Sequence, residues 1–244
     1  MANTILTHNL SEPLCGATTA RVHVDVADGN LMIDKLTSGE QVLASGTLQY
    51  LENQGLPTRS VNVENGHATL TLSAKSTRRP WLHLPWSACN GATEWQLHLN
   101  PNVQSDVTAQ SGGGNVKLDF AGMSITRVSA GTGGGNMDVV LPENAANLSV
   151  NVKTGGGNVT VEVGHGMTGS NIVNATSGAG NVIVQIPNGV AARIHASTGW
   201  GKAIIDPRFS KTDTTYQSPD FDQAVNRVEI MLHSGAGNVS VNTK

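Results

Sequence analysis

The sequence carries little charge and few aromatic residues, and these shortages exclude several kinds of protein. Charged residues make up 14% of the chain, aromatic residues make up 4%, and the net charge is −3. A surface that binds nucleic acid or anionic lipid needs clustered Lys and Arg. The only basic dipeptide is Arg78-Arg79. We therefore expect no nucleic-acid partner.

Long apolar runs are also missing, so we expect no direct membrane span. No run reaches the roughly 18 residues that a membrane-spanning helix needs. Residues 1–8 have neither the basic nor the apolar region of a signal peptide. We expect a cytoplasmic protein, with the cell envelope as the alternative if the N-terminus has been trimmed. Cys15 and Cys89 lie far apart and outside any CxxC pattern, which favours two free thiols.

Glycine, in contrast, is abundant and belongs largely to a repeated motif. The motif reads Ser or Thr, Gly, any residue, Gly, Asn and an apolar residue. Its six copies begin at Ser111, Thr132, Thr154, Ser177, Thr198 and Ser234. The steps between successive Asn positions are 21, 22, 23, 21 and 36 residues, with Lys202 replacing Asn in the fifth copy. A period near 20 residues predicts stacked rungs rather than one globular core.

The residues around each motif alternate between apolar and polar. Eight residues before the Asn position stand β-branched residues, at Val107, Val128, Val150, Val173, Ile194 and Ile230. Six residues before it stand apolar ones, and the residue between the two is mostly polar, as at Thr108 and Asn151. Alternation with period 2 indicates half-buried strands. Each repeat is therefore predicted as strand, glycine bend, strand and turn.

The motif residues have expected structural roles. The glycines suit a sharp corner, through positive φ or through backbone too crowded for a Cβ. Gly157→Val should therefore destabilise strongly, whereas Thr160→Ser should have little effect. Equivalent residues of stacked rungs lie one strand spacing apart. The Asn side chains should then form a ladder, with Lys202 as its one break and the following apolar residues buried beneath, at Asn115, Asn136, Asn158, Asn181 and Asn238.

The N-terminal third shows a degenerate version of this pattern, with Asp28-Gly29-Asn30 in the motif register. Asn65-Gly66 between alternating segments predicts a hairpin with a type I′ turn. We expect one continuous domain in three parts. Residues 1–75 form degenerate rungs and a hairpin, residues 76–101 form a Trp- and Pro-rich connecting segment, and residues 102–244 form regular repeats with an insertion at 207–225.

Aromatic residues gather in the connecting segment and in the insertion. The favoured interpretation is that they cover the flanks of the stack. If the chain is a contact module, these same residues should engage the partner, because aromatic side chains dominate binding hot spots. They are Trp81, Trp86, Phe209, Tyr216 and Phe221. Should they be buried, the binding surface is expected on the outer polar positions, such as Thr108, Ser129, Asn151 and Asn174.

No residue set indicates catalysis, a cofactor or a metal. The glycine bends lead into no predicted helix and carry no Walker Lys, and calcium-binding repeats need Asp and a shorter period. Asp119 and Glu162 stand two rungs apart, about 10 Å, which an inverting glycosidase could use, but solvated surface charges are the simpler interpretation. The eight histidines are spread singly and form no zinc pattern. We therefore expect no catalytic, cofactor-binding or metal-binding residues.

Several stretches resemble a known family. They are Trp95-Gln-Leu-His-Leu99, Gly112 to Phe120, Ile186-Pro-Asn-Gly-Val190, Tyr216 to Ile230 and the closing Ser234-Gly-Ala-Gly-Asn-Val239. Residues 95–244 resemble the C-terminal domain of LiaF-type cell-wall-active-antibiotic-response proteins, in the bacterial toast-rack group, many of which are named adhesins. Residues 1–75 resemble a weaker part of the same architecture. The resemblance implies an all-β, single-handed β-solenoid without catalytic residues.

The resemblance also implies a role in envelope-stress signalling through protein contacts, often beside a sensor kinase. We accordingly predict a non-enzymatic recognition or regulatory module whose partner is an unknown protein, such as a membrane sensor kinase or an envelope component. The alternative is a surface adhesin or glycan-binding protein. A remote alternative is a polysaccharide-active enzyme that uses Asp119 and Glu162.

Overall fold

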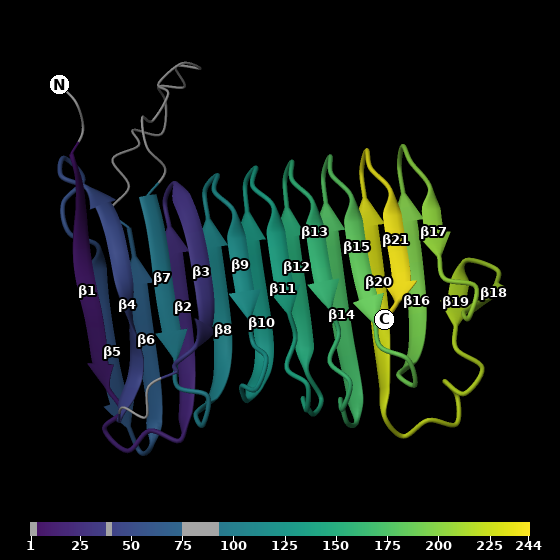
Figure 1. The fold of residues 1–244 in the computed structure, drawn as a ribbon, viewed down its shortest axis with the longest axis horizontal. Coiled ribbons are helices and arrows are strands. Elements are labelled where there is room, and N and C mark those ends of the chain that lie inside the picture. Colours follow the sequence, from purple (N-terminus) through teal and green to yellow (C-terminus); the bar gives the residue numbers. More distant parts are fainter. Residues whose placement is uncertain (1–3, 38–40, 75–92) are drawn as a thin grey trace.

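The computed structural model describes residues 4–37, 41–74 and 93–244, and in these ranges every regular element is a β-strand. The strands form two facing sheets with the core between them (Figure 1). The ten-stranded sheet has the order β1 (Ile5–Pro13), β4 (Val42–Leu51), β7 (Thr93–Leu99), β3 (Gly29–Lys35), β9 (Val116–Asp119), β11 (Met137–Val140), β13 (Val159–Glu162), β15 (Val182–Ile186), β21 (Val239–Thr243) and β17 (Ala203–Ile205). The described residues contain no helix long and apolar enough to cross a membrane.

The eleven-stranded sheet lies opposite. Its order is β18 (Ser210–Thr212), β19 (Thr215–Gln217), β16 (Ala191–Thr198), β20 (Arg227–Ser234), β14 (Ser170–Ser177), β12 (Ser149–Thr154), β10 (Ile125–Thr132), β8 (Gln104–Ser111), β2 (Thr19–Val26), β6 (His67–Ser73) and β5 (Thr58–Glu64). Each copy of the motif joins one strand of this sheet to one strand of the other. The rungs are β8–β9, β10–β11, β12–β13, β14–β15, β16–β17 and β20–β21.

The rungs pair in parallel and in the register that the sequence predicts. Val128 lies opposite Val107 on one side and Val150 on the other. These residues are at most 1% exposed, whereas the intervening Asn151 is exposed. The β-branched side chains pack on the inner faces of both sheets, where their stiff χ1 angles suit a pleated surface. The stacked two-strand rungs of the predicted all-β solenoid are confirmed.

At both ends, the order of rungs in space departs from their order along the chain. The last rung, β20–β21, lies between β14–β15 and β16–β17. Similarly, the rung β2–β3 lies between the rung β8–β9 and the strands β6 and β7, although β6 and β7 come later in the sequence than β2–β3. The 36-residue step in the motif reflects this exchange, because the chain passes beyond the final rung position before it returns to fill it.

The bend glycines are required by close packing of backbone, and the positive φ that we expected as a second reason is absent from them. A Cβ on Gly157 would stand 2.1 Å from the carbonyl oxygen of Gly135 in the preceding rung. At the middle glycine, Gly156, a Cβ would meet nothing closer than 3.9 Å. The first and third glycines therefore let the rungs approach, whereas the middle position has room for a side chain.

The predicted Asn ladder is present. The backbone N–H of Asn136 donates to Oδ1 of Asn115 at 2.8 Å, and the N–H of Asn158 donates to Oδ1 of Asn136 at 2.9 Å. The ladder continues through Asn181 and Asn238. It begins earlier than expected, since the N–H of Asn115 donates to Oδ1 of Asn30 at 2.9 Å.

The sequence suggested that Lys202 interrupts the ladder, but Lys202 instead ends it. Its backbone N–H donates to Oδ1 of Asn238 at 2.9 Å, and its rung is the outermost at this end of the ten-stranded sheet. No later rung needs the side-chain acceptor that Asn supplies elsewhere. Lysine therefore stands where the ladder function is no longer required.

The predicted N-terminal features are also confirmed. Leu31 of β3 lies opposite Val116, which places Asp28-Gly29-Asn30 in the motif register. Asn65 and Gly66 have φ of 51° and 76°, as a type I′ turn needs, and they join the antiparallel strands β5 and β6. Cys15 is exposed and free, whereas Cys89 lies outside the described residues.

Candidate functional site

The aromatic residues of the insertion are structural, so the prediction that they contact a partner is wrong for Phe209 and Phe221. These side chains are 4% and 3% exposed, and Tyr216 is half-buried against the core. The end of a stack exposes its interior, and Phe209 joins the core there. The guanidinium of Arg193 lies over the Phe221 ring at 4.2 Å. The simpler interpretation, that the aromatic residues cover the flank, is confirmed for both. Trp81 and Trp86 lie outside the described residues.

The polar residues of the same insertion fasten it to the last strands. The backbone N–H of Ala192 donates to Oγ of buried Ser218 at 3.0 Å, and the N–H of Ser218 donates to the carbonyl of Ala192 at 2.9 Å. Asn226 accepts the N–H of Gly169 at 3.0 Å through Oδ1. The Tyr216–Asn226 stretch, on which part of the family resemblance rests, is therefore explained by structure.

The carboxylates of the remote enzymatic alternative have other partners. Asp119 and Glu162 stand two strands apart, as predicted, with Val140 between them. Oδ1 of Asp119 accepts the N–H of Ala121 at 3.1 Å in a turn, and Glu162 pairs with the ammonium of Lys244. Neither lines a described cavity. Among the described residues, no group of three or more His, Cys, Asp or Glu is placed to hold a metal ion.

A groove lies on the outer face of the eleven-stranded sheet, at its C-terminal end. Its volume is about 490 Å³. Two rows of residues cross β16, β20 and β14 to form its floor, and the turn of the β18–β19 hairpin forms a wall. The lining residues are Asn174, Thr176, His195, Ala196, Ser197, Thr214, Met231, Leu232 and His233.

Hydrogen bonds position the two histidines of the groove. His233 Nδ1 lies 2.9 Å from Oγ of Ser197, and His195 Nδ1 lies 3.3 Å from Oγ1 of Thr215. His195 also approaches Glu229, with Nε2 at 3.5 Å from the carboxylate. None of the lining residues is an acid, a lysine or an arginine. The groove therefore offers hydroxyl, amide and imidazole groups around an apolar floor.

The sequence pointed toward this groove through one residue only. Asn174 belongs to the outer polar positions that were expected to form the binding surface if the aromatic residues are buried. Its row continues along the sheet through Thr108, Ser129 and Asn151. No sequence pattern indicated that Met231, which is 44% exposed, or the hairpin turn would meet them. His195 and His233 lie on paired strands with an offset of two positions, because Ser197 lies opposite His233.

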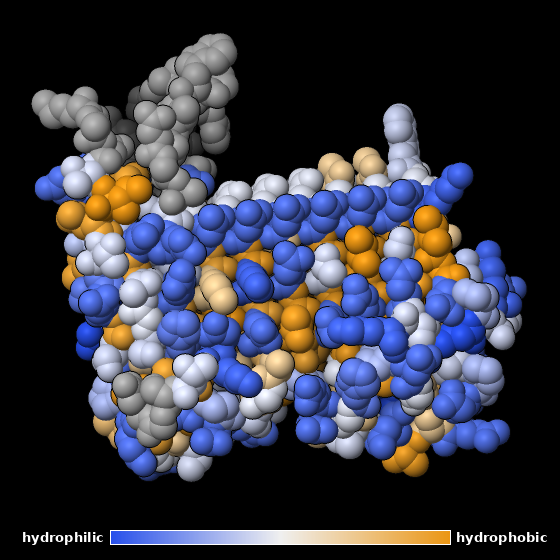
Figure 2. All heavy atoms as spheres, in the orientation of Figure 1, coloured by the Kyte–Doolittle hydropathy of each residue, from blue (hydrophilic) through white to orange (hydrophobic). Residues whose placement is uncertain are grey.

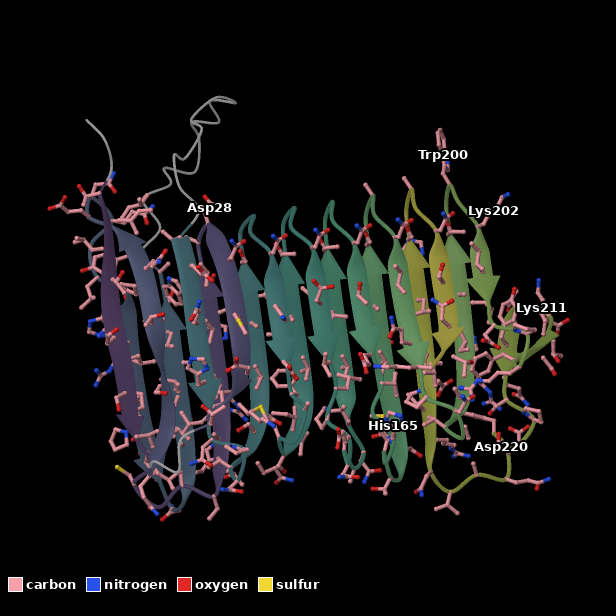
Figure 3. The ribbon with its side chains drawn as sticks, in the orientation of Figure 1. Asp28, His165, Trp200, Lys202, Lys211 and Asp220 are labelled. Atoms are coloured by element: carbon pink, nitrogen blue, oxygen red, sulfur yellow. The ribbon has the colours of Figure 1, made fainter. Side chains whose placement is uncertain are left out.

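A second exposed feature is Trp200, to which the sequence assigned no functional role. It occupies the middle position of the terminal bend and is 84% exposed. Figure 3 shows its side chain pointing away from the stack, next to Lys202. The available signal was its size, because the other five copies of the motif have Gly or Ala at this position.

One comparison with a solved structure agrees with this architecture. A crystal structure described as a putative cell adhesion protein from Clostridium sporogenes has 19% sequence identity and a TM-score of 0.72, covering 99% of this chain and 100% of that one. A putative adhesin from Bacteroides fragilis has 10% identity and a TM-score of 0.31, covering 98% and 97%. A search of curated proteins finds no match. Residues 3–162 match the model of the N-terminal domain of toast-rack proteins, DUF2154, so the chain belongs to the toast-rack family.

Proposed function

We propose that this chain is a non-enzymatic recognition module that binds a protein partner in the groove at the C-terminal end of the eleven-stranded sheet. The observation that carries the proposal is the combination of exposed apolar and neutral polar side chains there. Met231 is 44% exposed on the groove floor, and Ile172 is 41% exposed on the adjacent strand β14. Buried apolar anchors within a polar rim are typical of protein interfaces.

The charge of the groove narrows the choice of ligand. With no lysine or arginine in the lining, a phosphate finds no permanent positive charge. The lining holds two histidines, His195 and His233, fewer than the three or four ligands that a zinc ion needs. Methionine adapts its shape to different partners and is enriched at interfaces. These properties favour an uncharged, partly apolar stretch of polypeptide.

The biological setting that we propose is the cell-envelope stress response, with a membrane sensor kinase or an envelope component as the partner. The resemblance of residues 95–244 to LiaF-type domains supports this setting. A surface adhesin or glycan-binding protein is the alternative, and the name of the Clostridium sporogenes structure favours it. The first setting predicts a protein partner in the same cell, and the alternative predicts a partner on another surface. Crosslinking in cells that make the protein distinguishes them.

The test places a photo-crosslinking amino acid at Met231 in cells that naturally make the protein. The matched control places it at Asp138, which is exposed on β11 of the opposite sheet. We expect a protein adduct at position 231 that is absent at position 138, and its mass spectrum identifies the partner. Met231→Glu should abolish capture without lowering the melting temperature. Identical adducts at both positions, or none at 231, would contradict the proposal.

A further inference from the structure

The asparagine ladder uses only half of each side-chain amide. In each rung Oδ1 accepts the backbone N–H of the next rung, which fixes the orientation of the amide. An Asn amide also carries two N–H donors on Nδ2. Within the described part of the chain, these donors have no protein acceptor at Asn115, Asn136, Asn158, Asn181 and Asn238. All five residues are exposed, so a straight row of unused donors follows the stack axis.

The surface beside this row is low and nearly flat. The middle residue of each bend is small in five successive rungs, at Gly113, Gly134, Gly156, Ala179 and Ala236. Figure 2 shows the hydrophilic row as a continuous band along this edge of the molecule. On the bend side of the ladder, a ligand therefore meets no large side chain over these rungs. On the strand side it lies beside the exposed Lys117 and Asp138, two residues beyond Asn115 and Asn136.

The terminal rung changes both positions at once. Trp200 stands in the line of small residues and Lys202 stands in the line of asparagines, and both are exposed (Figure 3). The N–H of Trp200 donates to the carbonyl of Gly235 at 2.9 Å, so the backbone that presents the indole is held in place. Because the backbone is already ordered, binding has to immobilise only the two side-chain torsions of the indole. The row thus ends in a large aromatic face.

We infer that this edge binds a linear polysaccharide that runs along the stack axis. The ladder amides donate hydrogen bonds to its hydroxyl and carbonyl oxygens, and Trp200 stacks on the apolar face of one sugar ring. The donors repeat every strand spacing, about 4.8 Å, which is close to the length of one sugar unit in an extended glycan. Because successive β-1,4-linked units are turned over, every second donor meets the same side of the glycan. The site lies on the bends, so it is distinct from the groove and goes beyond the proposed function.

Other linear polymers fit this row less well. Carbonyl groups on one side of an extended peptide repeat about every 6.8 Å, because successive residues point to opposite sides. A single-stranded nucleic acid needs several cations along its path. The ladder positions offer one cation, Lys202, at the end. A neutral chain rich in acceptor oxygens matches the amide donors without that requirement.

The experiment titrates the protein with chitohexaose and cellohexaose, both straight neutral oligosaccharides, and with curved maltohexaose as a control. Tryptophan fluorescence and the side-chain amide NMR signals of the ladder report binding. We expect saturable binding of at least one straight hexaose, with shifts at the ladder amides. Trp200→Ala should weaken it by about tenfold or more, as loss of an aromatic anchor does.

The decisive variant is the pair Asn115→Asp and Asn158→Asp. Aspartate keeps an oxygen that accepts the N–H of the next rung but removes the Nδ2 donors. Folding should be preserved while binding falls by about tenfold or more. Asn144→Asp makes the same change in the exposed turn between β11 and β12, away from the ladder, and should leave binding unchanged.

Three results would overturn the inference. One is the absence of saturable binding by both straight hexaoses, and another is binding that survives the paired Asp variant with unchanged affinity. The third is a blue shift of tryptophan fluorescence with phosphatidylcholine–phosphatidylglycerol vesicles but not with either sugar, absent in Trp200→Ala, which would assign this edge to a lipid surface. The first two leave the groove proposal standing, because crosslinking at Met231 tests a different face.

Discussion

The backbone N–H of Lys202 donates to Oδ1 of Asn238 at 2.9 Å, so the fifth copy of the repeat lies outside the sixth. The sixth copy is therefore an interior rung, and its strand β21 has neighbours on both sides, β15 and β17. The outer position falls to β17, a strand of three residues preceded by a lysine. Short strands and lysine are devices that protect a sheet edge from pairing with another chain.

Deletion of residues 227–244 should therefore unfold the C-terminal half rather than shorten the stack. The deletion removes five fully or almost fully buried apolar side chains, Val228, Ile230, Leu232, Val239 and Val241. Each contributes about 1.5–3 kcal/mol when buried. It also opens the interior between β14 and β16, which no longer have a strand between them. Size-exclusion chromatography and circular dichroism should show aggregation or loss of sheet structure, and a soluble, cooperatively melting product would contradict this role.

Alanine at two adjacent bend glycines should change the unfolding free energy by very different amounts. Gly157→Ala forces a Cβ to within 2.1 Å of the carbonyl oxygen of Gly135, and backbone cannot yield as a flexible side chain does. We expect a loss of at least about 2 kcal/mol in unfolding free energy. Gly156→Ala should change it by no more than about 0.5 kcal/mol, because the site is open. Urea unfolding of both variants makes the comparison, and equal losses would show that the crowding is not decisive.

The repeat revealed the rungs because their periodicity is written into every copy. Buried β-branched residues, glycine bends and ladder asparagines all recur in one frame, so local pattern was sufficient for the fold class. The exchange of the last two rungs was not predictable in the same way. Oδ1 of Asn181 accepts a backbone N–H, and Lys202 and Asn238 each carry one, so the ladder motif alone does not select the neighbour.

The candidate sites were harder to predict because they depend on which side chains are exposed and which strands are neighbours in the sheet. Phe209 and Trp200 are both aromatic residues near the same end, yet one is 4% exposed and the other 84%. Composition does not distinguish them. The groove likewise combines Asn174, Met231 and Thr214 from three separate segments, and only the pairing of β14, β20 and β16 brings them together.

The hydroxyl of Thr154 should contribute to stability through two hydrogen bonds. Oγ1 donates to the carbonyl of Gly135 at 2.8 Å and accepts the N–H of Gly157 at 3.2 Å. Thr154→Val keeps the shape but leaves both backbone groups without a partner, at a cost of about 1–3 kcal/mol each. Thr154→Ser retains the hydroxyl, as Ser177 does in the next rung, and should cost about 1 kcal/mol or less. A thermal melt in which Thr154→Val is as stable as Thr154→Ser would show that the two hydrogen bonds of the hydroxyl contribute little.

The buried carboxylate of Glu12 should make stability depend on pH. The side chain is 1% exposed, and its Oε1 lies 2.8 Å from Nε of Arg59, which is half exposed. Burial raises the pKa of Glu12 above its ordinary value, and the attraction of Arg59 and His8 does not cancel this effect. The unfolded chain therefore releases the proton first as pH rises, so ionisation of this group favours unfolding above the ordinary glutamate pKa of about 4.3.

Glu12→Gln should consequently stabilise the protein at neutral pH, because an amide of the same shape has no charge to bury. Arg59 can return to water when its partner is neutral. The gain should shrink as pH falls below about 4.3, because Glu12 then becomes protonated in the unfolded chain as well. Urea unfolding between these pH values measures it, with Glu52→Gln on an exposed loop as the control for loss of one negative charge. A Glu12→Gln protein that is less stable at neutral pH, with a loss that disappears at low pH, would show that the ion pair with Arg59 outweighs the cost of burial.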